Sequence, residues 1–212
     1  MNHIENLIRR YPALESVRQS LEDGYALLEK GYLGGGKLLV AGNGGSCADA
    51  EHISGELMKG FCSKRPVSPE FARTLQNIDP ELGATLAANL EGALPTLALT
   101  SQGALASAFM NDTDPYGVYA QQVYGLGRPG DVFFGISTSG NSRNILMAAV
   151  TARAKGMQVL ALTGEDGGKL ARLADVAVKV PEGETYQVQE LHLPVYHCWC
   201  LMLEQRFFGG HL

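Results

Sequence analysis

Near the start of the chain, apolar residues recur every three or four positions, which is the spacing of a helix buried along one face. The two series are Ile4, Leu7, Ile8 and Tyr11, followed by Val17, Leu21, Tyr25 and Leu28. This pattern predicts two helices within residues 4–33. The glycine-rich stretch 31–36 then ends the helical part, so residues 1–36 are interpreted as N-terminal helices with a role in oligomerisation.

Further along, the apolar residues form short continuous runs. The runs cover residues 37–41, 94–100, 131–137, 158–164 and 176–180. Helical patterns alternate with them, at about 47–60, 103–126 (interrupted near "NDTDPYG"), 142–155, within "GGKLARLA", and at 184–208. Continuous rather than alternating apolar strands are typical of a parallel sheet covered on both faces. The pattern therefore predicts an α/β fold, a three-layer sandwich with a parallel sheet of about five strands, over residues 37–212.

Residues 62–92 interrupt this alternation. They contain prolines at positions 66, 69 and 80, and their helical pattern is patchy. We interpret the segment as an insertion in the domain, with one or two short helices.

Composition and charge exclude several classes of protein. Of the 212 residues, 45% are hydrophobic and 18% are charged, which is typical of a well-packed globular chain. No apolar run approaches the roughly 18 residues of a membrane-spanning helix. The net charge of −5, without a basic cluster, argues against general nucleic-acid binding. The four cysteines form no CxxC pair, which is typical of reduced thiols and predicts a cytoplasmic protein.

Two loops that follow strands have unusual compositions. "GNGGS" occupies residues 42–46, and "STSGNS" occupies residues 137–142 just before a predicted helix. Neither is a Walker loop, because GxxxxGK[ST] is absent. The first amides of a helix are unpaired and partly positive, so hydroxyl groups beside them favour a phosphate site. The alternative is a simple helix cap made by Ser139 or Asn141.

Two pairs of polar residues lie on predicted helix faces. His52 and Glu56 are four positions apart, which places them on one face of a helix. Gln189 and His197 are eight apart on the last predicted helix, with Pro194 predicting a kink between them. Such groups can bind a metal or transfer protons. By itself, however, the first pair is also compatible with an ordinary surface contact.

Several stretches together resemble the sugar isomerase (SIS) domain family, and most closely its bacterial phosphoheptose isomerases. They are "GNGGS" (42–46), "DAEHISGEL" (49–57), "ND" (111–112), "GISTSGNS" (135–142), "LTGEDGGKL" (162–170) and "QELHLPVYH" (189–197). The resemblance covers most of residues 37–205. It departs from the family at residues 62–92, which look like an addition of roughly two dozen residues and put the identity of the sugar in question.

The resemblance implies a SIS fold and a phosphosugar substrate. It implies that the Ser/Thr loop holds the sugar phosphate, through Ser137, Thr138, Ser139 and Ser142. It implies further substrate contacts from Asn43, Gly44, Gly45, Ser46, Asn111, Asp112 and Gln189. It also implies a homotetramer whose active sites are built by neighbouring subunits.

For the reaction, the resemblance implies aldose–ketose isomerisation through an enediol. The expected conversion is sedoheptulose 7-phosphate to D-glycero-D-manno-heptose 7-phosphate, with Glu56 as base and His197 as acid. The family's heptose isomerases use the positions of His52, Glu56, Gln189 and His197 to ligate zinc or transfer protons, so zinc is the expected metal.

Two other functions are compatible with parts of the sequence. One is a non-enzymatic relative that associates with a replication initiator and is similar in "QQVYGLGRPGDV" and in the "HCWCLMLE" region. That relative lacks the glutamate and the late histidine, whereas Glu56 and His197 are both present here. The other is a phosphosugar-sensing protein without turnover. Turnover of sedoheptulose 7-phosphate separates the three hypotheses.

Overall fold

The computed structural model describes residues 3–209 and contains one sheet of five parallel strands. The order across the sheet is β2-β1-β3-β4-β5. The strands are β1 (Leu38–Ala41), β2 (Thr96–Ala98), β3 (Val132–Ile136), β4 (Gln158–Thr163) and β5 (Val176–Lys179). The parallel sheet predicted from the continuous apolar runs is confirmed.

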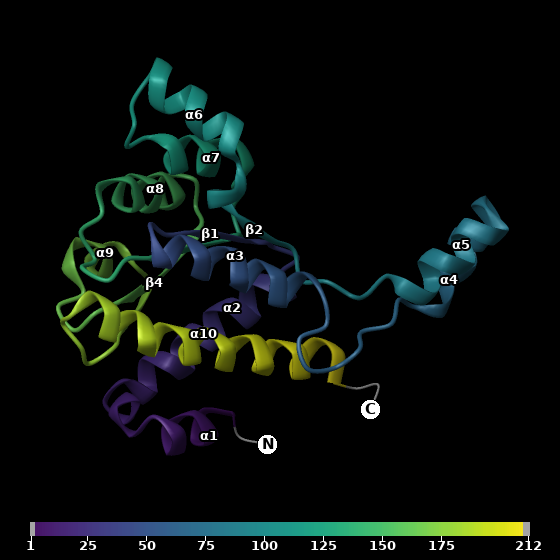
Figure 1. The fold of residues 1–212 in the computed structure, drawn as a ribbon, viewed down its shortest axis with the longest axis horizontal. Helices are drawn as coiled ribbons and strands as arrows, with labels where there is room; N and C mark the ends of the chain where they lie inside the picture. Colours follow the sequence, from purple (N-terminus) through teal and green to yellow (C-terminus); the bar gives the residue numbers. More distant parts are fainter. Residues whose placement is uncertain (1–2, 210–212) are drawn as a thin grey trace.

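Helices cover both faces of this sheet (Figure 1). One face is covered by α2 (Arg18–Leu33), α3 (Gly45–Met58) and α10 (Thr185–Phe208), and α1 (His3–Arg10) packs on α10 from outside. The other packs against α7 (Val118–Leu126), α8 (Arg143–Ala154) and α9 (Gly168–Leu173). Successive residues of β3 enter opposite layers, because Phe134 joins the first core and Phe133 the second. The strands have continuous apolar runs because the layers on both faces of the sheet are apolar.

The N-terminal helices belong to the core of the same chain. Between α1 and α2, a 3-10 helix (Pro12–Val17) buries Leu14 completely. Trp199 of α10 donates its indole N–H to the Leu21 carbonyl at 2.9 Å. A side chain at Gly24 would collide with the Trp199 ring, because its Cβ would lie 2.6 Å from Cζ2. The apolar face of these helices is therefore covered within the chain.

Residues 67–90, here called the arm, project away from the body (Figure 1). The arm consists of α4 (Pro69–Ile78) and α5 (Pro80–Asn89), each starting with proline at its first turn. Ser68 and Asp79 cap the two helices by accepting hydrogen bonds from backbone amides. An isolated β-bridge between Pro66 and Glu91 brings the two ends of the arm together. The prediction of one or two short helices here is confirmed.

One expectation differs from the structure. The strand expected at 94–100 is only Thr96–Ala98, and a 3-10 helix (Leu99–Ser101) follows it. β2 lies at the edge of the sheet and pairs only with β1, so fewer ladder bonds hold it. The interrupted helical region expected over 103–126 is confirmed, because it consists of α6 (Gly103–Asp112) and α7, separated at "NDTDPYG". Within residues 3–209, no helix has both the length and the apolar character needed to cross a membrane.

Candidate active site

The loops after β1 and β3 meet at one edge of the sheet, because these two strands are neighbours and parallel. They surround a cavity of about 350 Å³. It is lined by Asn43, Gly44, Gly45, Ser46, Ile136, Ser137, Thr138, Ser142, Thr185 and Gln189. A crevice at the carboxyl ends of the strands is the usual ligand site of an open parallel sheet. Eight of the predicted substrate-binding residues therefore line one cavity.

The hydroxyl loop is held in place partly by its own contacts. Ser137 is 4% exposed and donates its hydroxyl to Ser142 Oγ at 3.1 Å. Ser142 is the N-cap residue of α8, but its side chain makes no capping hydrogen bond. Because no side chain caps the helix at this position, a bound anion can take the place of that acceptor.

The alternative of a cap from Ser139 or Asn141 is wrong, because the N-cap position of α8 is Ser142. Instead, Ser139 Oγ accepts the amide of Asn141 at 3.2 Å, and Asn141 Oδ1 accepts the amide of Lys169 at 3.1 Å. Gly140 has a φ of 63°, and its position leaves no room for a Cβ beside the Gly167 carbonyl. These contacts turn the tip of the loop towards α9 rather than towards the start of α8.

Three predicted substrate contacts lie elsewhere. Ser139 is absent from the residues that line the cavity. Asn111 and Asp112 are at the exposed end of α6, where the Asn111 amide donates to Asp112 Oδ1 at 2.8 Å. α6 buries none of its residues in this chain. One chain therefore does not bring these two residues to the cavity.

Helices α3 and α10 run side by side in the same direction (Figure 1). At their first turns the backbone of Gly45 touches the side chain of Gln189, because a Cβ at Gly45 would lie 2.6 Å from Gln189 Nε2. Two turns further along, the rings of His52 and His197 meet edge to face with centroids 4.9 Å apart. The same helix pair therefore brings together residues that are more than 140 positions apart in the sequence.

Glu56 lies within reach of these histidines. Its Oε1 is 3.2 Å from His52 Nε2, and its Oε2 is 3.5 Å from Lys59 Nζ. The Glu56 side chain is 14% exposed, whereas that of His52 is 42% exposed. A carboxylate that is largely screened from water but adjacent to imidazoles is suited to accept and return a proton.

His197 lies on α10, between Arg10 of α1 and His52 of α3. Its Nε2 atom is buried and has no hydrogen-bond partner. Burial lowers the pKa of His197, the neighbouring His52 and Arg10 lower it further, and Glu56 acts in the opposite direction. The imidazole is therefore biased towards its neutral form.

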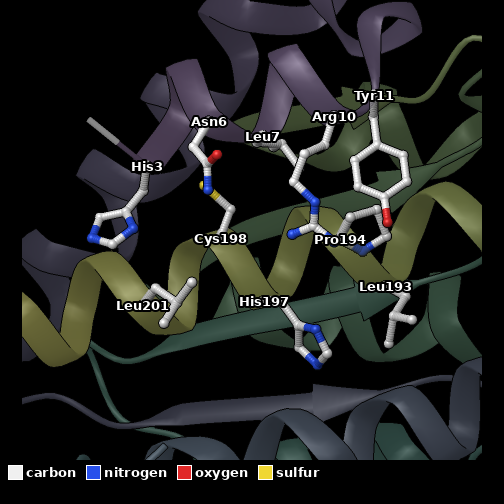
Figure 2. Close-up of a pocket in the computed structure, with 10 residues that line it drawn as sticks. All are labelled: His3, Asn6, Leu7, Arg10, Tyr11, Leu193, Pro194, His197, Cys198 and Leu201. Carbon is white, nitrogen blue, oxygen red and sulfur yellow. The ribbon is translucent and has the colours of Figure 1, made fainter. Parts of the chain in front are cut away.

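Arg10 is a residue that the sequence analysis missed. It lines a cavity of about 140 Å³ between α1 and α10, together with Tyr11 and His197. Figure 2 shows Arg10 reaching from α1 towards α10, while the His197 ring points to the other side. No local motif marks Arg10, because it belongs to an ordinary amphipathic helix and meets His197 only through tertiary packing.

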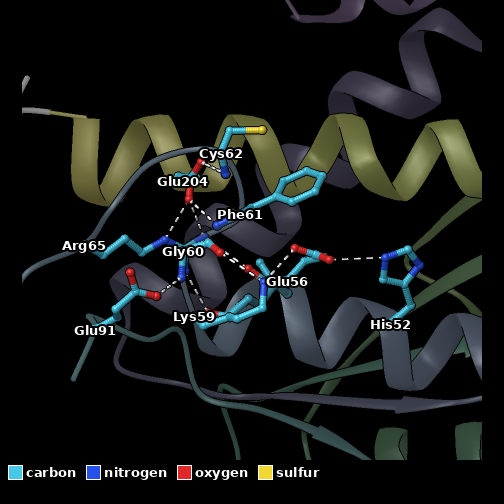
Figure 3. A network of polar contacts seen from close by, with 10 residues as sticks. His52, Glu56, Lys59, Gly60, Phe61, Cys62, Arg65, Glu91 and Glu204 are labelled. Carbon is cyan, nitrogen blue, oxygen red and sulfur yellow. Dashed lines mark hydrogen bonds and ion pairs between the residues drawn. The ribbon is translucent and has the colours of Figure 1, made fainter. Parts of the chain in front are cut away.

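A buried ion pair fixes the end of α3 (Figure 3). Arg65 is 1% exposed, and its guanidinium contacts Glu204 of α10 at 2.9 Å. The same guanidinium donates to the backbone carbonyls of Leu57 and Glu56 at 3.0 and 3.1 Å. The turn of chain that follows Glu56 is therefore fastened directly to α10.

Glu204 also accepts the amides of Phe61 and Cys62, at 2.8 and 2.9 Å. Burial by itself raises the pKa of the Glu204 carboxyl, but these two amides and Arg65 outweigh it, and the pKa lies below its ordinary value. The carboxylate thus stays ionised and keeps four hydrogen-bond donors gathered around it.

The predicted zinc ligands are only partly gathered. His52, Glu56 and His197 are neighbours, but Gln189 lines the cavity at the hydroxyl loop. Within residues 3–209, no three His, Cys, Asp or Glu side chains already converge on a point where they could hold one metal ion. The residue types suit zinc, and the unpartnered Nε2 atom of His197 can offer its lone pair to a metal beside His52 and Glu56.

The five-stranded parallel sheet with a hydroxyl-rich loop after β3 agrees with a sugar isomerase (SIS) domain protein, and the family model of the SIS domain matches residues 74–164. A phosphoheptose isomerase of Sulfurimonas denitrificans is 37% identical over 195 residues, covering 92% of this chain and 87% of that one. One of Aneurinibacillus thermoaerophilus is 36% identical over 210 residues, covering 98% and 93%. The chain therefore belongs to the phosphoheptose isomerase family and is an isomerase.

Solved structures agree with this assignment. The phosphoheptose isomerase of Neisseria gonorrhoeae superposes with a TM-score of 0.74 at 32% identity, covering 96% of this chain and 95% of that one. The enzyme of Francisella tularensis gives a TM-score of 0.73 at 28% identity, covering 95% and 94%. The fold predicted from the sequence resemblance is thereby confirmed.

The Arg65–Glu204 contact predicts a large effect of one neutral substitution. Glu204→Gln leaves the buried guanidinium without its counter-charge, so the free energy of unfolding should fall by about 3–5 kcal/mol. Glu29→Gln is the matched control, because Glu29 pairs with Arg206 at the surface and exposed pairs contribute less than about 1 kcal/mol. Urea denaturation of both variants measures the difference. Equal losses in the two variants would contradict the role assigned to the buried pair.

Proposed function

We propose that this chain converts sedoheptulose 7-phosphate to D-glycero-D-manno-heptose 7-phosphate. The observation that carries the proposal is the shared α3–α10 interface, with the hydroxyl-loop cavity at its start and Glu56, His52 and His197 further along. The seven residues from Gly45 to His52 span roughly 10 Å of helix. An extended seven-carbon sugar phosphate is of similar length, so one substrate can reach both ends.

In the proposed reaction, Glu56 removes a proton from C1 of the ketose while His197 donates a proton to the carbonyl oxygen on C2. The C1 hydroxyl of the resulting enediol then returns a proton to His197, and Glu56 delivers its proton to C2, which gives the aldose. A neutral imidazole is a suitable donor to a carbonyl oxygen, and the lowered pKa of His197 favours that form. Phosphate binding at the hydroxyl loop positions the reacting carbons from a distance.

The non-enzymatic alternatives share the fold, and phosphate binding alone does not separate them from an isomerase. The relatives described above are named phosphoheptose isomerases, and their alignments with this chain cover most of both sequences. That agreement, together with Glu56 and His197 at one site, supports turnover. The initiator-associating and sensing hypotheses remain outcomes of the turnover measurement.

Removal of the base should abolish most turnover. Glu56→Gln retains the shape of the side chain but not its basicity, so kcat should fall by roughly 100-fold or more, and His197→Asn should have an effect of the same kind. Glu51→Gln, the same substitution on the exposed side of α3, serves as control and should keep the parent rate. A coupled assay of aldose formation gives all three rates. Parent activity in Glu56→Gln would show that another group is the base.

Loss of hydroxyls from the cavity should weaken phosphosugar binding. Ser137→Ala and Ser142→Ala each remove a group that lines the cavity, and each should cost about 1–3 kcal/mol of binding free energy, since hydrogen bonds to a charged partner are involved. Ser16→Ala is the control, because the Ser16 hydroxyl bonds the Ala13 carbonyl in the N-terminal region. Calorimetry with the substrate on an inactive Glu56→Gln background measures the affinities. Unchanged affinity in both cavity variants would contradict a phosphate site here.

We further propose that the enzyme uses zinc, held by His52, Glu56 and His197; Gln189, the fourth ligand that the resemblance implies, would have to turn away from the hydroxyl-loop cavity to join them. The support is the chemistry of this donor set and the buried, unpartnered Nε2 of His197. A zinc ion would stabilise the negative charge that develops on the enediolate oxygens. The steps assigned above to Glu56 and His197 are stated without it.

Metal binding can be measured without turnover. The purified chain, stripped with a chelator and titrated with Zn²⁺ alone, should bind about one ion per chain, and His197→Asn should bind it at least about tenfold more weakly. His3→Asn on α1 is the matched control and should bind like the parent. Mass-spectrometric metal analysis and calorimetry provide the stoichiometry and the affinity. Equal zinc binding by the parent and His197→Asn would remove His197 from the ligand set.

We also propose a cytoplasmic homotetramer in which neighbouring subunits complete each active site. The support is the set of apolar side chains that remain exposed on the arm: Phe71, Ile78, Leu82, Leu86 and Leu90. Exposed apolar clusters of this kind are typical of protein interfaces. Asn111 and Asp112 lie outside the cavity of their own chain, and this position also favours a contribution to the site of another subunit.

Light scattering should report a tetramer for the parent and a smaller species when the arm is disrupted. Because the arm's ends are bridged, residues 67–90 can be replaced by two glycines without separating Pro66 from Glu91. A milder variant, Ile78→Lys with Leu82→Lys, places charges on side chains that are 80% and 64% exposed. Val150→Lys on α8, at a position 53% exposed, is the control. A monomeric parent at micromolar concentration would contradict the assembly.

A further inference from the structure

Four side chains form a continuous line of polar contacts between α3 and α10. The Tyr196 hydroxyl donates to Asp49 Oδ1 at 3.1 Å. The same hydroxyl oxygen lies 3.1 Å from His52 Nδ1. On the far side of the imidazole ring, His52 Nε2 lies 3.2 Å from Glu56 Oε1. Asp49 and Tyr196 have no part in the reaction described above, yet they are connected through His52 to the proposed base.

Tyr196 is held firmly in this position. It is 1% exposed and belongs to the core between the sheet and α10. Its ring meets the rings of His52 and His197 edge to face, with centroids 5.7 and 5.0 Å apart. Its hydroxyl therefore has a fixed location, between one carboxylate and one imidazole.

The number of protons in this line determines the direction of each bond. An ionised carboxylate only accepts hydrogen bonds, and a phenol has a single proton to donate. The pKa of Asp49 is raised, because burial outweighs the hydrogen bond from Tyr196 and the neighbouring His52, which both lower it; the geometry nevertheless has the Tyr196 hydroxyl donating to Asp49 Oδ1. With the Tyr196 proton directed to Asp49, the phenol oxygen can only accept from His52, so Nδ1 must carry the imidazole proton.

We propose that Tyr196, anchored by Asp49, is a positioning residue that holds His52 in the Nδ1–H tautomer. The lone pair of Nε2 then faces the carboxylate of Glu56. The catalytic role of this positioning by Tyr196 rests on the proposed isomerase function. Two acceptors 3.2 Å apart repel unless a proton or a cation lies between them. The arrangement therefore directs both atoms to a divalent ion when one binds.

The parent protein supplies the first test. Long-range ¹H–¹⁵N spectra of the full chain distinguish the two neutral tautomers of each imidazole, and His52→Gln identifies the His52 signals among those of the five histidines. We expect the neutral His52 ring to carry its proton on Nδ1. A proton on Nε2 would overturn the proposal. This reading requires neither turnover nor metal, so it stays decisive if the proposed function fails.

Tyr196→Phe supplies the second test, because it deletes one hydroxyl and keeps the buried ring. We expect the His52 signals to shift towards a mixture of tautomers and kcat to fall by about 10- to 100-fold with KM unchanged. The affinity for Zn²⁺ alone should fall by a similar factor, since one ligand loses its orientation.

Tyr32→Phe is the matched control. Tyr32 is also buried, and its hydroxyl bonds Thr96 Oγ1 at 2.8 Å, away from the site. It should lose a similar amount of stability while keeping the parent kcat and the parent His52 tautomer. If Tyr196→Phe changed stability alone, with the tautomer, kcat and zinc affinity as in the parent, Tyr196 would be only a structural residue and the proposal would be wrong.

Discussion

The close parallel contact between α3 and α10 is the constraint on which the site depends. At its start, the absence of a side chain at Gly45 lets the two helices approach until the backbone touches Gln189. Because both helices rise by the same amount per residue, a contact fixed at the first turn fixes the later ones. His52 consequently meets His197, and the cavity at the hydroxyl loop is aligned with the acid–base group. A bulkier residue at position 45 would displace both ends of the site together.

The far end of this helix pair is fastened by the buried contact of Arg65 with Glu204. An ion pair in such a place costs desolvation, and it is favourable only when its remaining donors and acceptors are also paired. Here the guanidinium reaches backbone carbonyls of α3, and the carboxylate reaches amides of the following turn. The Arg65 carbonyl in turn accepts the amide of Gly92, beyond the arm. The arm thus leaves and returns through a closed set of contacts, which lets it extend without loosening Glu56.

The sequence predicted the sheet well because each strand is apolar on both faces, and that pattern is local. The hydroxyl loop was also readable, since its chemistry is concentrated in six residues after one strand. In contrast, Arg10, the Arg65–Glu204 pair and the contact of Tyr196 with Asp49 had no local signal. Glu204 is 139 positions from Arg65, and Tyr196 is 147 positions from Asp49. Such partners are chosen by the packing of α1, α3 and α10, which no periodicity describes.

The surface that this chain leaves uncovered is concentrated around one edge of the sheet. β2 is one of the two edge strands, and the segments without a buried apolar face, the arm and α6, lie before and after it in the chain. Leu97 of β2 itself is also exposed. The N-terminal helices bury apolar residues against α10 within the chain, and their role in oligomerisation stays a prediction. An edge strand flanked by uncovered helices is a natural place for a second copy to pack. Asn111 and Asp112 end α6, one of these uncovered helices, and lie outside the cavity of their own chain.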